Sequence, residues 1–272
     1  MLPNFLGIGA NRAGSTWLFH NLSRHDDIFL PRQKELHFFD RDYDKGLAYY
    51  ENKFAGWTGE SAVGEITPQY LYREAAAMRI KEDLPGIKLF VSLRNPVDRA
   101  YSQYWRSVAR GVIPKSESFE VAIAERDYIL DYGNYFKHLT PYYTHFDRDR
   151  LLVLLMDSIK KEPLETLRQL CIYLQVKPEF GDNYTAERVN SASSTKNLAR
   201  SKSLWYLQRL INRLKLKRLK IRVEKMNRQP LPPMNEETHR FLQDYYRDEI
   251  LQTQDLVQLD LGRWLLEKQE LR

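Results

Sequence analysis

The sequence has only one cysteine, Cys171, in 272 residues. An internal disulfide is therefore impossible, and a reducing compartment is the expected environment. No uninterrupted apolar run reaches the roughly 20 residues that a transmembrane helix needs. No charged and then apolar signal segment precedes the first predicted strand. These absences predict a soluble, cytoplasmic protein with no transmembrane segment.

Acidic residues are scarce in one stretch of the chain. Residues 200–228 hold eleven lysines and arginines and only Glu224 as an acid, whereas the whole chain has 42 basic and 36 acidic residues. The rest of the chain is therefore net acidic, and we expect no nucleic-acid partner. Residues 200–228 suit contact with an anionic membrane or a polyanionic acceptor. The alternative is a helix that packs its leucines on the core and leaves a solvated basic face.

The composition and the apolar pattern predict a single domain over residues 1–272. Apolar residues make up 43% of the chain, which is enough to bury a substantial core. Short apolar runs alternate with segments of 3.6-residue period, and this alternation predicts an α/β fold with a central parallel sheet flanked by helices. Strands are expected at 4–9, 62–66, 87–93 and 151–156, and helices at 15–25, 44–55, 69–84, 96–110, 118–130, 162–174, 203–218, 236–257 and 260–269.

The first predicted strand, residues 4–9 (NFLGIG), runs into residues 10–17 (ANRAGSTW) and then into a helical pattern. This P-loop-like segment offers backbone N–H groups, the hydroxyls of Ser15 and Thr16, the cation of Arg12 and the positive end of a helix dipole. Such a loop is typical of a phosphate site. The lysine and the spacing of a Gly-x4-Gly-Lys-Ser/Thr loop are missing, so we expect a phosphate-like ligand that binds without a metal.

A second block, residues 88–102 (KLFVSLRNPVDRAYS), places Arg94 at the carboxyl end of a buried strand. Asn95 suits the cap of the next helix and Pro96 its first turn, so Ser102 lies two turns into that helix. Ligands of open α/β sheets bind beyond the carboxyl ends of the strands, where the first loop also lies. The two sites together suit a nucleotide phosphorylated at its 3′ and 5′ positions. The alternative for Arg94 is an internal ion pair.

With these two blocks, the chain resembles the sulfotransferases that depend on 3′-phosphoadenylyl sulfate (PAPS). The first loop is similar to the 5′-phosphosulfate loop of that family, and the second block is similar to its 3′-phosphate motif. The resemblance implies the sulfotransferase fold, with adenosine 3′,5′-bisphosphate (PAP) as product and no metal. It also implies that the donor is bound by Arg12, Ala13, Gly14, Ser15, Thr16, Trp17, Arg94 and Ser102.

Two further segments narrow the resemblance. Residues 34–50 (KELHFFDRDYDKGLAYY) resemble the heparan sulfate glucosaminyl 3-O-sulfotransferases, and residues 65–70 (EITPQY) are similar to a segment of that group and of the N-sulfotransferases. The heparan sulfate enzymes usually carry lysine where this chain has Arg12 and Ile66. They also carry a cysteine pair and a secretory anchor, which are absent here. The chain is therefore identified as a soluble, bacterial-type member, outside a Golgi glycosaminoglycan pathway.

The expected chemistry needs a cation and a base. A cation stabilises the charge that grows on the leaving phosphate oxygen, and a base takes the proton of the acceptor. Arg12 suits the first task. For the base, the 3-O-sulfotransferase resemblance implies Glu35 and the N-sulfotransferase resemblance implies Glu65, and cooperation of the two stays open. The alternative for Glu35 is a solvated ion pair with Lys34 or Arg32, and the alternative for Glu65 is a buried structural ion pair at a strand end. The phenylalanines beside His37 favour a structural role for that residue.

Residues 190–200 (NSASSTKNLAR) lie where the family places a loop over the nucleotide, so the resemblance implies Lys196 and Arg200 as further donor contacts. A surface loop with solvated charges is the alternative. The acidic residues within 40–44 lack the spacing of a calcium loop, so no metal site is predicted.

The sequence therefore predicts transfer of a sulfuryl group from PAPS to a hydroxyl, or secondarily an amine, of a carbohydrate, lipid or small-molecule acceptor. Two alternatives stay open. One is a P-loop-like ATP-dependent kinase, which would work without the usual loop lysine. The other is a non-enzymatic protein on a sulfotransferase-like scaffold that binds a membrane or polyanion through residues 200–228.

Isothermal titration separates these three classes. We expect tight binding of PAP without magnesium, together with sulfotransferase activity that EDTA leaves unchanged, because the loop lacks the elements that organise a metal-bound triphosphate. Magnesium-dependent binding of ATP would instead support the kinase. Binding of neither nucleotide would support the non-enzymatic class.

Overall fold

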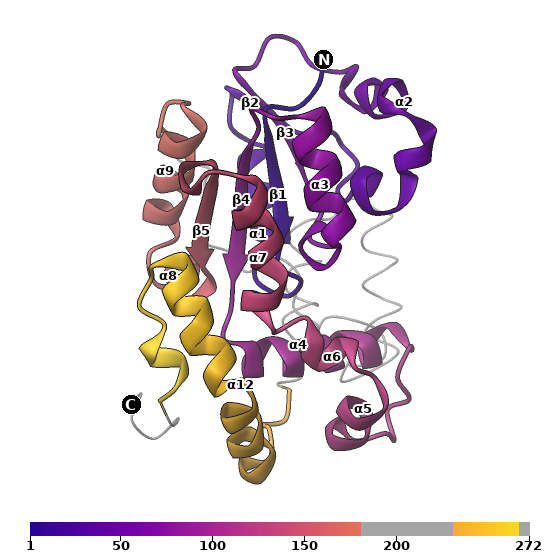
Figure 1. The fold of residues 1–272 in the computed structure, drawn as a ribbon, viewed down its shortest axis with the longest axis vertical. Helices are drawn as coiled ribbons and strands as arrows, with labels where there is room; N and C mark the ends of the chain where they lie inside the picture. Colours follow the sequence, from indigo (N-terminus) through magenta and orange to yellow (C-terminus); the bar gives the residue numbers. More distant parts are fainter. Residues whose placement is uncertain (181–230, 267–272) are drawn as a thin grey trace, which may run out of the picture.

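Five strands form one all-parallel sheet in the computed structural model, which describes residues 1–180 and 231–266 (Figure 1). The strand order is β2-β3-β1-β4-β5, so the first strand of the chain lies in the middle of the sheet. Phe5 pairs with Gly64 on one side and with Lys88 on the other. The strands are β1 (Phe5–Gly9), β2 (Ile28–Phe29), β3 (Ala62–Ile66), β4 (Lys88–Leu93) and β5 (Leu151–Leu155).

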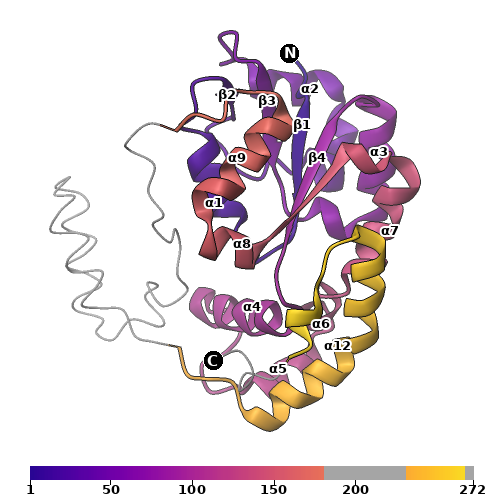
Figure 2. The ribbon, with the colours of Figure 1, turned by 90° about the vertical axis from the view of Figure 1, so that its left-hand side faces the viewer.

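Helices cover both faces of the sheet (Figure 2). One face carries α1 (Ser15–Leu22), α8 (Met156–Lys161) and α9 (Pro163–Leu174), and the other carries α3 (Glu74–Asp83) and α7 (Tyr135–His145). The long α12 (Glu236–Val257) packs on α7 and α4. Beyond the sheet lie α4 (Pro96–Arg110), α5 (Phe119–Glu125) and α6 (Tyr128–Asp131), whereas α2 (Leu47–Glu51) lies at the periphery near α3.

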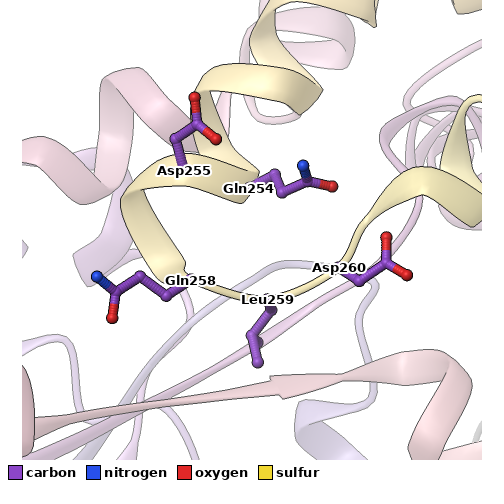
Figure 3. A pocket seen from close by; sticks show the side chains of 5 residues that line it. All are labelled: Gln254, Asp255, Gln258, Leu259 and Asp260. Atoms are coloured by element: carbon purple, nitrogen blue, oxygen red, sulfur yellow. The ribbon is translucent and has the colours of Figure 1, made fainter.

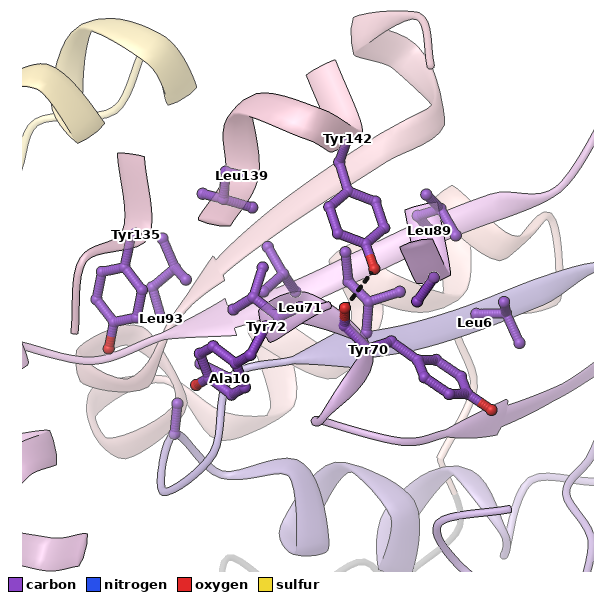
Figure 4. Packing of buried hydrophobic residues seen from close by; sticks show 14 of the residues in the cluster. Leu6, Ala10, Tyr70, Leu71, Tyr72, Leu89, Leu93, Tyr135, Leu139 and Tyr142 are labelled. Carbon is purple, nitrogen blue, oxygen red and sulfur yellow. Dashed lines mark hydrogen bonds between the residues drawn. The ribbon is translucent and has the colours of Figure 1, made fainter. Parts of the chain in front are cut away.

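The strands read as continuous apolar runs because both faces of the sheet are buried. Alternate side chains enter two separate clusters: Phe5 and Phe90 pack against α1 and α9, whereas Leu6 and Leu89 pack against α3 and α7. Figure 4 shows the second cluster, in which the Tyr142 hydroxyl donates a hydrogen bond of 2.8 Å to the Tyr70 carbonyl. This bond ties the covering helix α7 to the chain that follows β3.

The predicted α/β class, the parallel sheet and the four predicted strands are confirmed, and two helices match to the residue. The helix over 96–110 begins where Asn95 Oδ1 accepts a 3.0 Å hydrogen bond from Val97 N, and it ends at Gly111 in the left-handed region. The helix over 236–257 begins where Asn235 Oδ1 accepts from Glu237 N at 2.8 Å. These ends could be predicted because Asn95, Gly111 and Asn235 are typical capping residues.

Three predicted helices are wrong because the chain turns within them. The helix expected over 44–55 is divided at Gly46, whose φ of 78° and ψ of 161° exclude a helix. The helices expected over 69–84 and 118–130 break at Arg73 and Arg126, which have extended backbones. The shorter pieces are two turns of 3-10 helix at Tyr43–Lys45 and Asn52–Phe54, a third at Tyr70–Tyr72, and the helices α2, α3, α5 and α6.

Other differences concern short elements and the end of the chain. The prediction missed β2, α7, α8 and the π-helical turn at Phe38–Asp42. Helix α7 contains Pro141, which argues against a helix in the sequence. Helix α8 follows β5 without a polar turn, so the sequence has no signal for its start. Helix 260–269 is wrong in its described part, which holds a 3-10 turn at Gly262–Trp264. The helix expected over 203–218 lies outside the described residues. The assignment of residues 1–272 to a single domain stays a prediction.

No helix within residues 1–180 and 231–266 is long and apolar enough to cross a membrane. The long α12 carries several acidic and basic side chains along its 22 residues.

Close packing between the two central strands gives a test of the sheet. A Cβ atom on Gly64 would lie 2.4 Å from the carbonyl oxygen of Phe5, a backbone atom that cannot move without disturbing β1. We expect Gly64→Ala to lower the free energy of unfolding by about 1–3 kcal/mol or more, as overpacking does. Denaturant unfolding measures this, with Gly86→Ala as control because no atom lies within 4 Å of its added Cβ. Equal stability of the two variants would contradict the strand pairing.

Candidate active site

The loop between β1 and α1 has a shape that needs glycine at its last position. Gly14 has φ of 97°, and an added Cβ would lie 3.0 Å from Met156 Sδ. Its carbonyl accepts hydrogen bonds from Trp17 N and Leu18 N, which starts α1. The first N–H groups of a helix have no carbonyl partner within it, so this end of α1 can receive an anion.

The remaining loop residues divide into buried and accessible ones. Ala13 is fully buried, and its carbonyl accepts a 2.6 Å hydrogen bond from Ser92 Oγ of β4. The Trp17 side chain packs in the core with α9, so only the backbone of Trp17 is near the loop. Thr16 is half-buried and Ser15 nearly buried at the start of α1. These placements leave hydroxyl and backbone groups of Ser15 and Thr16 as the polar surface of the loop.

The structure brings the two predicted phosphate motifs together. Arg12 Nε donates a 3.1 Å hydrogen bond to Ser102 Oγ, and Arg94 Nη1 donates a 3.3 Å hydrogen bond to the Arg12 carbonyl. The acid that pairs with Arg94 is Asp98, at 3.9 Å and with a 44% exposed side chain, and the buried Arg94 Nε has no hydrogen-bond partner. The internal ion pair that was the alternative for Arg94 is therefore long and leaves a buried donor available to a ligand.

Positive charge accumulates around Arg12. Burial and then, in decreasing order, the neighbouring cations Arg106, Arg94, Arg110 and Arg99 together lower the pKa of Arg12 to about 10. Arg99 is fully buried, donates to the Ile129 carbonyl and has no carboxylate partner within the described residues. An anionic ligand would relieve this repulsion.

Sequence reasoning missed Arg106 and Arg110. Both follow Ser102 on α4 at intervals of four residues, so they share one face of that helix with the predicted phosphate contact. This spacing is the signal that would have identified them. Burial and Arg110 lower the pKa of Arg106, whereas the charge of Glu35 raises it, so Arg106 extends the basic surface from the loop toward Glu35.

The two candidate bases have opposite surroundings. Glu65 is 1% exposed, whereas the side chain of Glu35 is 36% exposed. Glu65 Oε1 accepts hydrogen bonds from the hydroxyls of Tyr70 at 2.5 Å and Tyr50 at 3.3 Å. Its Oε2 accepts from Thr67 Oγ1 at 2.6 Å and Leu36 N at 3.3 Å. Burial raises the pKa of Glu65, and these hydrogen bonds oppose the rise.

Glu35 lies at a point where the backbone is unusual. Glu35 and His37 have φ of 64° and 57°, in the left-handed region that non-glycine residues rarely adopt. Lys34 Nζ lies 2.5 Å from Glu35 Oε1 and 3.5 Å from Ser15 Oγ, so the base candidate is joined to the phosphate loop. His37 Nδ1 lies 3.0 Å from Asp40 Oδ2, and this hydrogen bond raises the pKa of His37. His37 therefore has a structural carboxylate partner.

Some predicted features fall elsewhere. Lys196, Arg200 and the whole of residues 200–228 lie outside the described residues. Within the part that the structure describes, no group of three or more His, Cys, Asp or Glu side chains is arranged to hold a metal ion. A surface pocket at the carboxyl end of α12 shares no residue with the predicted site (Figure 3). It is lined by Gln254, Asp255, Gln258, Leu259 and Asp260.

Comparison with known proteins agrees with the fold. The solved structure of a sulfotransferase from Alicyclobacillus acidocaldarius superposes with a TM-score of 0.73 at 24% sequence identity, over 97% of this chain and 99% of that chain. This likeness confirms that the sheet and its helices have the arrangement of a sulfotransferase fold.

Curated relatives confirm the sequence resemblance. The heparan sulfate glucosamine 3-O-sulfotransferase 3B1 of Mus musculus is 31% identical over 190 residues, which cover 67% of this chain and 48% of that protein. The bifunctional heparan sulfate N-deacetylase/N-sulfotransferase 1 of Caenorhabditis briggsae is 29% identical over 202 residues, which cover 66% and 23% respectively. The chain thus spans about half the length of the mouse relative.

The family model described as "Sulfotransferase domain" matches residues 2–254, which include the loop at Arg12, the segment at Glu35 and the block at Arg94. The chain therefore belongs to the sulfotransferase domain family, a family of PAPS-dependent enzymes.

Proposed function

We propose that this chain transfers the sulfuryl group of PAPS to a hydroxyl, or secondarily an amine, of a carbohydrate, lipid or small-molecule acceptor. The observation that carries the proposal is the contact of Arg12 with Ser102 and Arg94, which joins a 5′-phosphosulfate loop to a 3′-phosphate site. Among these acceptors, the names of the matched relatives favour a sugar.

The donor fits the groups that the structure leaves available. PAPS has a phosphosulfate at one end of its ribose and a phosphate at the other, and Arg94 offers a buried, unpartnered Nε beside the second motif. Among the described residues, Arg12 and Arg99 have no carboxylate partner, and Arg94 has only the long contact of 3.9 Å with Asp98. In this assignment Ser15, Thr16 and the end of α1 hold the phosphosulfate, and Arg94 and Ser102 hold the 3′-phosphate.

Transfer breaks the bond between sulfur and the phosphate oxygen, whose electron pair stays on the phosphate. A new bond forms between sulfur and the acceptor oxygen or nitrogen, and Glu35 takes the proton that the acceptor loses. Arg12 stabilises the negative charge that develops on the phosphate oxygen. Exposure favours Glu35 over Glu65 as the base, because an acceptor that enters from solvent reaches only the former.

Glu65 then acts through its neighbours as a positioning residue. Its Oε2 accepts from Leu36 N, the peptide group that directly follows Glu35. Its Oε1 is occupied by the hydroxyls of Tyr50 and Tyr70. A buried carboxylate with donors on both oxygens fixes the backbone of residues 35–37, and with it the direction of the Glu35 side chain.

Replacing each glutamate by glutamine separates these two roles. With an acceptor found by screening labelled PAPS against fractionated extract, we expect Glu35→Gln to lower kcat about 10²–10⁴-fold without loss of stability, as removal of a general base does. Glu65→Gln should lower the free energy of unfolding by about 1–3 kcal/mol, because one amide cannot accept all the hydrogen bonds that Glu65 accepts. Near-wild-type turnover in both variants would overturn the assignment.

Arg12 is tested by comparing turnover with product binding. If Arg12 stabilises the leaving group, Arg12→Ala should lower kcat by about 10²–10³-fold and weaken PAP binding much less. Arg94→Ala is the matched control, since loss of a 3′-phosphate contact should weaken PAP binding and kcat/KM together. Equal losses of kcat and PAP affinity in Arg12→Ala would show that Arg12 only neutralises a phosphate.

A further inference from the structure

Lys34 connects the two halves of the candidate active site. Its ammonium lies 2.5 Å from Glu35 Oε1 and 3.5 Å from Ser15 Oγ, at the start of α1. The side chain of Lys34 is 17% exposed, about half the exposure of its partner Glu35. The cation is therefore held against the protein, between the phosphate loop and the proposed base.

An ordinary surface ion pair does not explain this position. The ammonium has three donors, and its two contacts belong to groups with different roles, one on the loop and one on the base. Leu36 N is fixed by the buried Glu65, and Glu35 has a left-handed backbone, so the chain around Lys34 is directed by contacts in the core. Solvated ion pairs of lysine and glutamate are rarely held in place by contacts with the core.

We propose that Lys34 is a second cation of the donor site and contacts the oxygens of the sulfuryl group that is transferred. This inference rests on the proposed function. In an in-line transfer the leaving phosphate lies at the loop and the acceptor at the base, so the sulfuryl group lies between Ser15 and Glu35. Because the Lys34 ammonium contacts both Ser15 and Glu35, it would lie beside the sulfur atom.

Lys34 and Arg12 then serve different parts of the donor. Arg12 is hydrogen-bonded to Ser102 of the 3′-phosphate motif, whereas Lys34 contacts Glu35 and Ser15. As the S–O bond to phosphate breaks and the S–O bond to the acceptor forms, Lys34 stabilises the sulfuryl oxygens. The acceptor proton goes to Glu35, so Lys34 exchanges no proton or electron pair.

The test compares two ligands that differ only by the sulfuryl group. Isothermal titration measures the affinity of the full chain for PAPS and for PAP. We expect Lys34→Met to weaken PAPS binding by about tenfold or more, the usual effect of losing a charge-assisted hydrogen bond, and PAP binding by less than twofold. Lys34→Arg should restore PAPS affinity to within about threefold. Lys45→Met, which removes a lysine that pairs with Asp42 at 3.2 Å, is the matched control and should change neither affinity.

A second arm distinguishes direct contact from an effect through Glu35. The Lys34→Met change is repeated in the Glu35→Gln background, and the loss of PAPS affinity should persist there. The conversion of PAPS to PAP with water as acceptor should also fall about 10²-fold in Lys34→Met, with partial recovery in Lys34→Arg.

Three results would overturn the proposal: equal losses for PAPS and PAP, disappearance of the PAPS effect in the Glu35→Gln background, or no loss at all. Retained PAP binding in Lys34→Met shows that the variant is folded. If the wild-type chain binds neither PAPS nor PAP, the proposed function fails as a whole. If it binds both and the ratio of the two affinities is unchanged in Lys34→Met, only the role of Lys34 fails.

Discussion

The geometry of this site depends on the hydrogen bonds that the buried carboxylate of Glu65 accepts. It lies on the central part of the sheet and is nearly inaccessible to solvent, yet it accepts hydrogen bonds from two tyrosine hydroxyls, a threonine hydroxyl and Leu36 N. A charge in such a place is tolerable only when every oxygen has donors. One of these hydrogen bonds comes from Leu36 N, the peptide group that follows Glu35. The buried Glu65 therefore also positions the exposed Glu35.

A second constraint is the excess of positive charge at the carboxyl end of the sheet. Arg12 and Arg94 are held by hydrogen bonds to Ser102 and to a carbonyl, which orient the cations without neutralising them. The fully buried Arg99 adds a charge that stays beneath the site. Burial, and after it repulsion from the neighbouring arginines, lowers the pKa of Arg12, and an anionic ligand offsets this repulsion. This relief of repulsion favours the binding of a multiply charged nucleotide.

Sequence reasoning succeeded where a local signal decides the structure. Asn95 and Asn235 cap their helices, and the apolar runs became strands because both faces of the sheet are covered. It failed where tertiary contacts decide, as at Arg73 and Arg126, whose extended backbones interrupt helical patterns. The phosphate motifs could be predicted because the loop and the start of the helix are contiguous in the sequence. The contact of Lys34 with Ser15 could not be predicted, because it depends on the left-handed backbone at Glu35, which no local preference favours.

The arrangement also explains why the strained residues lie where they do. In the described part of the chain, five non-glycine residues have positive φ. Arg12, Glu35 and His37 belong to the loop or to the segment beside it, whereas Gln175 and Gln258 end α9 and α12. Such conformations cost about 1–3 kcal/mol each and persist only when surrounding contacts impose them. Here those contacts are the Ser102 and Arg94 bonds of Arg12 and the Glu65 and Thr67 bonds of residues 36 and 37. A relaxed backbone at residue 35 would turn Lys34 and Glu35 away from Ser15, so the strain maintains the short path between the phosphate loop and the base.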